Sequence, residues 1–240
     1  MSVLLALLMF VLVMMLGHLL KRGGAPPTAM APAATVRRFR PLIESKFGMD
    51  VPSGYCFHPC HTWAVDEGWQ LIRVGVDRFA VNLLGRIEHI DVAGLYRWVR
   101  QGQKLMTITV AGISVDLPSP VEGALIAVNR AALENPELVT TDPFCEGWIA
   151  VIKSSCFATD EKNLMQGAMV APWMRNSIAL LREMCSRSPA LAQDGGSPLP
   201  GLLNRVSPEL RNRLVKEFFL TLPVVPVQPQ TGRFDGSAHS

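Results

Sequence analysis

Four side chains that can bind a metal ion lie within six residues of the sequence: Cys56, His58, Cys60 and His61. Thiolate and imidazole groups are the usual protein ligands of zinc. Ligands this close along a strand point to alternate faces, however, and no second ligand pair at zinc-finger spacing follows. We therefore expect no metal site, with zinc binding by this cluster as an alternative.

The same cluster also comes close to the attachment pattern of c-type haem. Cys56, Cys60 and His61 match that pattern apart from one extra residue between the two cysteines. A haem would need a domain outside the cytoplasm and a second axial ligand, for which the sequence offers no obvious candidate. A third interpretation is purely structural, with Cys60 and Cys145 as small buried side chains.

No other group of residues suggests catalysis or nucleic-acid binding. We find no recognisable arrangement of nucleophile, base and orienting acid, and the glycine-rich stretches resemble linkers rather than phosphate-binding loops. The chain has a net charge of +3, yet residues 54–158 carry eight basic against eleven acidic side chains. An acidic domain without a basic stripe is a poor match for a phosphate backbone. We therefore predict a non-catalytic protein that binds no nucleic acid.

Residues 54–158 alternate between short apolar runs and turn residues, a pattern typical of a β-rich domain. Asp66-Glu67-Gly68 separates the runs Thr62–Val65 and Trp69–Val76, as in a hairpin. Further strands are predicted at Ile87–Val92, Lys104–Ile108, Ile113–Leu117, Ala124–Val128 and Trp148–Ile152, with turns at Gln101–Gln103 and at Ala111–Gly112.

One short helix interrupts the predicted strands, over Arg78–Leu84. Asp77 can cap its first turn, and Gly85 can end it in a left-handed conformation. The spacing of the apolar residues predicts that Phe79, Leu83 and Val81 are buried.

Two longer helices are predicted after residue 158. Pro172 can lie in the first turn of a helix that ends near Arg187, with Met174, Ile178, Leu181 and Met184 or Cys185 on its packing face. A second helix begins at Ser207-Pro208-Glu209 and runs to Phe219, with Leu210, Leu214 and Phe218 on one face. We assign residues 159–222 to this helical extension and 223–240 to a disordered tail. Residues 188–200 have the composition of a linker.

The N-terminal segment predicts a membrane anchor. Val3–Leu20 is apolar apart from Gly17 and His18, and about 18 helical residues rise roughly 27 Å, close to the thickness of the bilayer core. Lys21 and Arg22 follow the apolar run and none precedes it, which favours a retained single-pass helix over a cleaved signal.

The position of these charges predicts an inner or cytoplasmic membrane protein whose C-terminal domain faces the cytoplasm. Residues 1–22 then form the anchor, and 23–53 form a linker with a basic juxtamembrane stretch. In a reducing compartment the five cysteines are expected to be free thiols.

Residues 54–158 contain a series of short motifs in a fixed order. They are His58–Trp63, Val74–Ala80 with Leu84-Gly85, Ser119–Gly123, Val128-Asn129, Asn135–Val139 and Asp142–Trp148. In the same order, these segments resemble the motifs of the glycine cleavage system H protein family, with His58–Trp63 similar to its H-E-W opening and Cys145 in place of a glycine. The resemblance implies a lipoyl-domain-like barrel-sandwich hybrid, in agreement with the strand pattern.

The resemblance also shows a departure at the position where the family carries lipoate. The lipoyl lysine of the family lies at a hairpin tip, eight residues before the proline of its S-P-V motif. The same count back from Pro120 reaches Gly112, and neither the glutamate nor the lysine of the family's tip is present. A carrier needs the amine of that lysine to hold its cofactor. Lys104 and Lys153 are poor substitutes because neither lies at the tip.

The sequence therefore predicts a membrane-anchored, non-lipoylated H-protein-like domain that acts as a binding or assembly module, with no cofactor. The expected contacts are the membrane, through residues 3–20, and a protein partner from a membrane redox complex or a glycine cleavage-like enzyme. The alternative is a lipoyl carrier or regulatory subunit of glycine cleavage. A metal or haem protein built on Cys56, His58, Cys60 and His61 is the third possibility.

Overall fold

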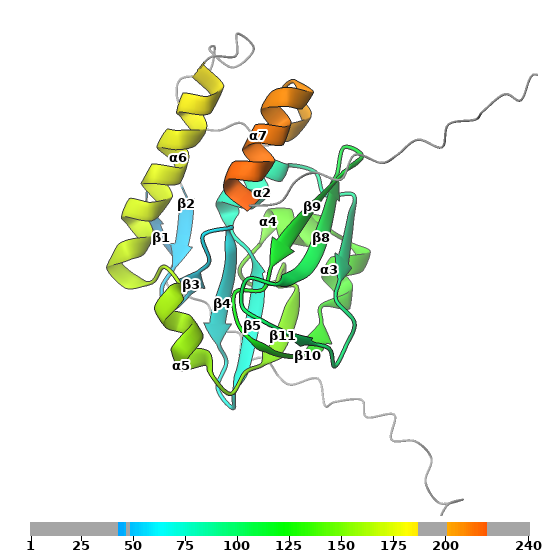
Figure 1. The fold of residues 1–240 in the computed structure, drawn as a ribbon, viewed down its shortest axis with the longest axis vertical. Coiled ribbons are helices and arrows are strands. Elements are labelled where there is room, and N and C mark those ends of the chain that lie inside the picture. The colour runs from blue at the N-terminus through cyan, green and yellow to red at the C-terminus, as the bar shows by residue number, and fades with distance from the viewer. Residues whose placement is uncertain (1–42, 47–48, 187–200, 220–240) are drawn as a thin grey trace, which may run out of the picture. The chain divides into compact units, whose positions relative to one another are not determined.

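The computed structural model describes residues 43–46, 49–186 and 201–219 (Figure 1). These residues all belong to one compact unit, residues 40–240. The predicted anchor, the linker at residues 188–200 and the C-terminal tail lie outside the described residues. Part of the predicted linker at residues 23–53 is described, and there it forms two paired strands, Ile43–Lys46 and Met49–Pro52, instead of a linker. Among the described residues, no helix is both long enough and apolar enough to cross a membrane.

The fold is mainly β, as predicted, and its strands form three antiparallel sheets. The sheet of two strands pairs β1 (Ile43–Lys46) with β2 (Met49–Pro52). The sheet of six has the order β3 (Cys56–Phe57), β4 (Thr62–Asp66), β5 (Leu71–Val76), β11 (Ala150–Lys153), β10 (Gly123–Val128) and β7 (Trp98–Val99). The sheet of three has the order β6 (His89–Val92), β8 (Lys104–Val110) and β9 (Ile113–Pro118).

The inward faces of the larger sheets share one hydrophobic core. In β8 and β10 buried residues alternate with partly exposed ones, because successive side chains of a strand point to opposite faces. Ile72, Leu125 and Ile152 face inward from three neighbouring strands, and Ile108 and Val115 meet them from the smaller sheet; all five have essentially no exposed surface.

Helix α2 (Arg78–Leu84) has the bounds that the sequence predicts. The Asp77 side chain accepts a hydrogen bond from the backbone N–H of Ala80, and Gly85 ends the helix with a φ of 78°. The predicted burial of Phe79, Val81 and Leu83 is confirmed, as is that of Ala80 and Leu84 beside them. Capping and turn chemistry act over a few residues, so the sequence alone determines this element.

The strand predicted to begin at Trp69 begins two residues later, at Leu71. Trp69 and Gln70 have φ angles of 56° and 64°, and the Leu71 N–H donates to the carbonyl of Gly68 over 2.9 Å. These residues therefore form a type I′ turn, with the Trp69 side chain 93% exposed. The strand was predicted to include these two residues because of their strand propensity, but the turn determines their conformation. Similarly, the strands predicted from Ile87 and Trp148 begin at His89 and Ala150.

Three short helices were not predicted: α3 (Arg130–Glu134), α4 (Glu137–Thr141) and α5 (Phe157–Asp160), which follows β11. Asn129 caps α3, since its side-chain oxygen accepts from the N–H of Ala132. The short segment α5 then leads through the 3-10 turns η1 (Glu161–Asn163) and η2 (Gly167–Met169) towards the C-terminal helices.

The C-terminal helices pack beside each other and against the β domain (Figure 1). Helix α6 (Val170–Ser186) buries Met174, Ile178, Leu181 and Cys185, as predicted. A 3-10 turn, η4 (Leu202–Asn204), contacts α2 before α7 (Pro208–Phe219) begins with the predicted proline. The buried face of α7 contains the predicted positions and two further residues: Leu210, Leu214, Val215, Phe218 and Phe219.

The approach of η4 to α2 is close because two glycines meet. The N–H of Gly201 donates to the carbonyl of Asn82 over 2.8 Å. A Cβ on Gly85 would lie 2.3 Å from the Cα of Gly201. A side chain at position 85 would therefore force this segment away from α2.

Gly85→Ala is expected to lower the free energy of unfolding by about 2–4 kcal/mol, because its methyl group meets backbone and its φ is left-handed. Gly102→Ala is the matched control, since Gly102 has a φ of 79° with nothing within 4 Å of an added Cβ. Its expected cost is about 1 kcal/mol. Urea unfolding followed by circular dichroism measures both. Equal losses would contradict a stabilising role for this contact.

Candidate functional site

The tip of the β8–β9 hairpin is a two-residue turn. Val110 pairs with Ile113, so Ala111 and Gly112 alone connect the strands. Their φ angles of 49° and 73° are those of a type I′ turn, the form that matches the twist of a hairpin. Gly112 is exposed, and nothing lies within 4 Å of a Cβ placed on it. The predicted tip is thus confirmed as an open, solvent-facing turn.

Glu88, the residue before β6, holds this turn. One carboxylate oxygen of Glu88 accepts from the backbone N–H of Ala111 over 3.0 Å, and the other lies 3.5 Å from the N–H of Gly112. The Glu88 N–H itself donates to the carbonyl of Thr109. Glu88 is not recognisable from the sequence, since nothing local indicates a contact 23 residues away.

An open pocket of about 1160 Å³ borders Glu88 on its other side. It lies between the end of α2, the α3–α4 junction and η4. Arg86 and Arg205 line it together with Glu88 and Glu137, so its charged side chains are of both signs. The C-terminal extension thus completes a hollow next to the hairpin tip.

At the other end of the hairpin, Lys104 is engaged in a local ion pair. Its ammonium group lies 2.7 Å from a carboxylate oxygen of Asp116, which also accepts from the hydroxyl of Thr107. Lys104 pairs with Pro118, six strand positions away from the tip, and therefore cannot act in place of Gly112. Lys153 ends β11 in the other sheet.

The residues of the quoted motifs have structural roles around this hairpin. The Ser119 hydroxyl donates to the carbonyl of Val121 over 2.6 Å. Gly123 permits the close approach of β10 to β11, because a Cβ there would lie 2.3 Å from the carbonyl oxygen of Lys153. The Asn129 amide donates to two carbonyl groups, those of Glu146 and Trp148. These motifs therefore maintain the fold whether or not the tip carries a cofactor.

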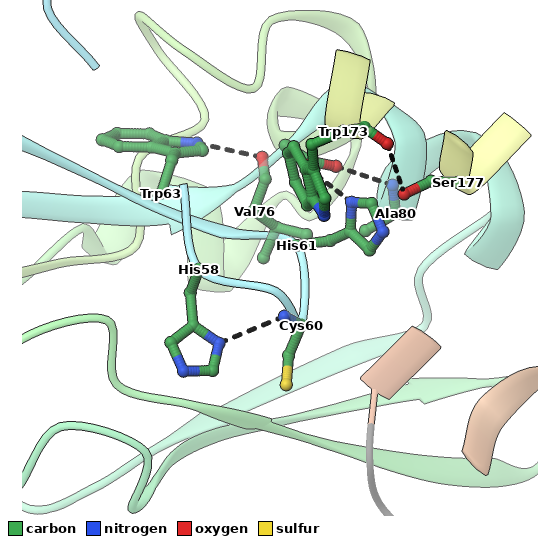
Figure 2. Close-up of polar contacts among 9 residues, drawn as sticks. His58, Cys60, His61, Trp63, Val76, Ala80, Trp173 and Ser177 are labelled. Atoms are coloured by element: carbon green, nitrogen blue, oxygen red, sulfur yellow. Dashed lines mark hydrogen bonds and ion pairs between the residues drawn. The ribbon is translucent and has the colours of Figure 1, made fainter. Parts of the chain in front are cut away.

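The side chains of the Cys56–His61 cluster make separate contacts, and Figure 2 shows those of His58, Cys60 and His61. The thiol of Cys56 faces a carboxylate oxygen of Glu161 at 3.8 Å, and Nδ1 of His58 accepts from the N–H of Cys60 over 3.1 Å. His61 turns away from both, towards Asp77. Within the part of the chain that the structure describes, no three His, Cys, Asp or Glu side chains are placed to share a metal ion.

Burial also makes the thiols of Cys56 and Cys60 unreactive at neutral pH. It raises the pKa of the Cys56 thiol to about 12, with Glu161 as a second cause, and that of Cys60 to about 11. Both thiols are almost fully buried, and all five cysteines are free. A buried, protonated thiol is a poor nucleophile and offers little access for haem attachment.

His61 instead joins several elements in the core. Its Nδ1 lies 2.8 Å from Oδ2 of Asp77, and both side chains are buried. Its ring stacks between Phe79 of α2 and Trp173 of α6, with centroids 4.2 and 4.8 Å away. Figure 2 shows the Trp173 ring beside it. Phe218 of α7 packs against the same group. We find a packing and hydrogen-bonding role for His61, with the ring out of contact with solvent.

The comparison with known families decides the assignment. A family model described as glycine cleavage H-protein matches residues 56–176 of the 240. The chain belongs to this family. A glycine cleavage system H protein of Prochlorococcus marinus is 32% identical over 106 residues, which cover 44% of this chain and 81% of the relative.

Two further H proteins illustrate the same relationship. One from Thermus thermophilus is 32% identical over 105 residues, covering 44% of this chain and 81% of its own. A crystal structure of an H protein from Mycobacterium marinum aligns at 24% identity with a TM-score of 0.41, covering 44% of this chain and 87% of that chain. The family match ends at residue 176, so most of α6, η4 and α7 lie beyond it.

The tip of this H-protein-family chain does not fit lipoate. An amide link to lipoate needs a primary amine, and neither residue of the turn has one. The two backbone N–H groups of the turn are directed at Glu88, which leaves them no role in holding a cofactor.

The burial of His58 predicts a pH-dependent stability. Burial lowers the pKa of His58 from 6.5 to about 4, with His61 as a smaller cause. Below pH 6.5 His58 therefore binds a proton in the unfolded chain, whereas in the folded chain it stays neutral down to about pH 4. The free energy of unfolding thus falls as the pH drops from 6.5 to 4.

His58→Asn keeps an acceptor for the Cys60 N–H but removes the titrating ring. Wild type is expected to lose about 3 kcal/mol relative to this variant between pH 6.5 and 4, measured by urea unfolding across the range. His89→Asn is the control, because it also replaces an imidazole, but at a position that is 62% exposed. If the free energy of unfolding had the same pH dependence in wild type and in His58→Asn, His58 would not be the group responsible.

Proposed function

We propose that this chain is a membrane-anchored H-protein-like domain that carries no lipoate and acts as a binding or assembly module. The observation that carries the proposal is the hairpin tip. Ala111 and Gly112 form a complete type I′ turn held by Glu88, at the position where the family resemblance expects the lipoyl lysine. The turn is well formed and exposed, but it has no side-chain amine to which lipoate could be attached.

The mode of attachment to the membrane is a second part of the proposal. Residues 3–20 supply an apolar run long enough to span a bilayer, followed by Lys21 and Arg22 on the side that the positive-inside rule assigns to the cytoplasm. The folded domain then works at the cytoplasmic face of an inner or cytoplasmic membrane. Its partner is a protein, either of a membrane redox complex or of a glycine cleavage-like enzyme.

The second candidate function is a lipoyl carrier or regulatory subunit of the glycine cleavage system, and family membership favours it. A carrier would have to use another lysine. Lys104 is paired with Asp116 at the far end of the hairpin, and Lys153 lies on the other sheet, which favours the first proposal.

Intact-mass spectrometry of the full chain, expressed with an active lipoylation system, is expected to find no lipoyl group on wild type. Gly112→Lys is expected to gain one, because position 112 is exposed and unobstructed. The left-handed φ of 73° should cost this variant about 1–2 kcal/mol.

Gly102→Lys is the matched control, since Gly102 has a similar φ of 79°, equally open surroundings and a place at the opposite end of the hairpin. It should stay unmodified. A lipoyl group on wild type would overturn the non-carrier proposal and favour the second candidate.

The anchor is tested by placing charge within the apolar segment. Leu8→Arg with Leu12→Arg is expected to release the full chain from membranes, because each central arginine costs about 2.5–3.5 kcal/mol in a membrane helix. Resistance to extraction by alkaline carbonate is the measurement. The control replaces the same two leucines with isoleucine and should stay in the pellet. Equal extraction of both variants would remove the anchor from the proposal.

A further inference from the structure

Residues 94–100, which lead into and through β7, expose an unusual set of side chains. Leu95, Tyr96 and Trp98 are 45%, 80% and 52% exposed, and Arg97 and Arg100 are exposed between and beside them. β7 is the last strand of the six-stranded sheet. Trp98 donates one hydrogen bond from Nε1 to the Glu122 carboxylate over 3.3 Å. Large aromatic side chains normally bury most of their surface, however, so the exposure of this group points to a contact outside the folded domain.

The backbone holds these side chains outward in a fixed conformation. The N–H of Tyr96 donates to the carbonyl of Leu125 over 2.6 Å, and the N–H of Leu125 donates back to the carbonyl of Arg97 over 3.0 Å. Tyr96 has a φ of 65°, a left-handed conformation that is unfavourable for an aromatic residue. Packing of the Tyr96 ring within the domain does not offset this backbone strain, because the ring is largely in solvent.

Strand register places basic groups on the same side. Trp98 pairs with Ala124, and Ala124 pairs with Lys153, so the three share the outward face of the sheet. Val99 is buried between Trp98 and Arg100, so these two also point away from the core.

Lys162 of η1 adds a further basic side chain to this set. Its neighbour Asn163 donates a hydrogen bond to the side chain of Gln101 over 2.8 Å, which places η1 next to residue 100. Among the described residues, Arg97, Arg100, Lys153 and Lys162 make no ion pair and no side-chain hydrogen bond. Their charges are thus available to an external anion.

We propose that residues 94–100, with Lys153 and Lys162, form a surface that binds anionic lipid headgroups. Tryptophan and tyrosine favour the boundary between headgroups and acyl chains, because each has an apolar ring with a polar end. Unpaired arginine and lysine side chains add attraction to an anionic leaflet.

This inference rests on the anchoring part of the proposed function, which brings the domain to a bilayer. About 20 residues separate the apolar segment from β1. A random-coil linker of that length would have an average span of roughly 25 Å, a distance that brings the surface within reach of the lipid.

A lipid surface explains these residues better than a protein partner. Tryptophan, tyrosine and arginine are also frequent hot spots of protein interfaces, but hot spots cluster in well-packed pockets. These side chains line neither the pocket beside α2 nor the smaller one beside Cys56. They lie on an edge strand, with four basic groups that lack internal partners.

The test uses the full chain reconstituted into vesicles of phosphatidylcholine with or without phosphatidylglycerol. Quenching of tryptophan emission by brominated phospholipid is expected in the anionic vesicles and should be largely lost in Trp98→Phe. Arg97→Ala with Arg100→Ala should weaken the quenching, since each basic residue near the surface contributes roughly fivefold to partitioning.

Arg86→Ala with Arg205→Ala is the matched control, because it removes the same charge from the pocket beside α2. It should leave the quenching unchanged. Equal quenching in wild type and Trp98→Phe, or quenching that ignores the anionic lipid, would overturn the proposal. So would protection of residues 94–100 from hydrogen exchange by a co-purified protein in detergent.

Flotation of the vesicles separates this inference from the anchor. A wild-type chain that floats with both kinds of vesicle but shows no quenching of Trp98 retains the anchor and refutes the lipid surface. A chain that floats with neither kind refutes both.

Discussion

The contact between Asp77 and His61 is the constraint on which the arrangement of the domain depends. Asp77 uses one carboxylate oxygen to cap α2 and the other to hold Nδ1 of His61. Because both side chains are buried, neither can exchange its partner for water, and removing either would leave an unsatisfied polar group in the core. The His61 ring then fixes α2 relative to α6 through Phe79 and Trp173. The placement of α2 in turn determines where η4 docks and where the pocket beside Glu88 opens.

The same reasoning explains how the family's motifs can persist around a tip that has no lysine. Gly123, Asn129 and Gly147 occupy positions where a different side chain would meet backbone or leave carbonyl groups unpaired. Packing and hydrogen bonding require these three residue types at these positions, whether or not a cofactor is bound. Position 112 has no such requirement beyond a left-handed turn, and is therefore free to change with function.

The sequence predicts what is decided locally. The bounds of α2, the proline start of α7 and the position of the hairpin tip depend on residues a few places apart, and all three are confirmed. Trp69 was misplaced because its strand propensity is overruled by a turn. The links from Glu88 to the tip and from His61 to Trp173 were not predicted, since they join residues 23 and 112 positions apart that meet only through the fold. The anchor at residues 3–20 lies outside the described residues and stays a prediction.

The two ends of the β8–β9 hairpin differ in a way that suits a tethered module. β8 has seven residues, so its ends lie roughly 20 Å apart. One end has the bare tip, Glu88 and the neighbouring pocket. The other lies next to Gln101 and Glu122, and Trp98 donates to the Glu122 carboxylate over 3.3 Å. A domain that meets the bilayer through residues 94–100 therefore presents its tip away from the lipid. In that proposed orientation the exposed turn and the pocket beside Glu88 both face away from the bilayer and stay open to a partner protein.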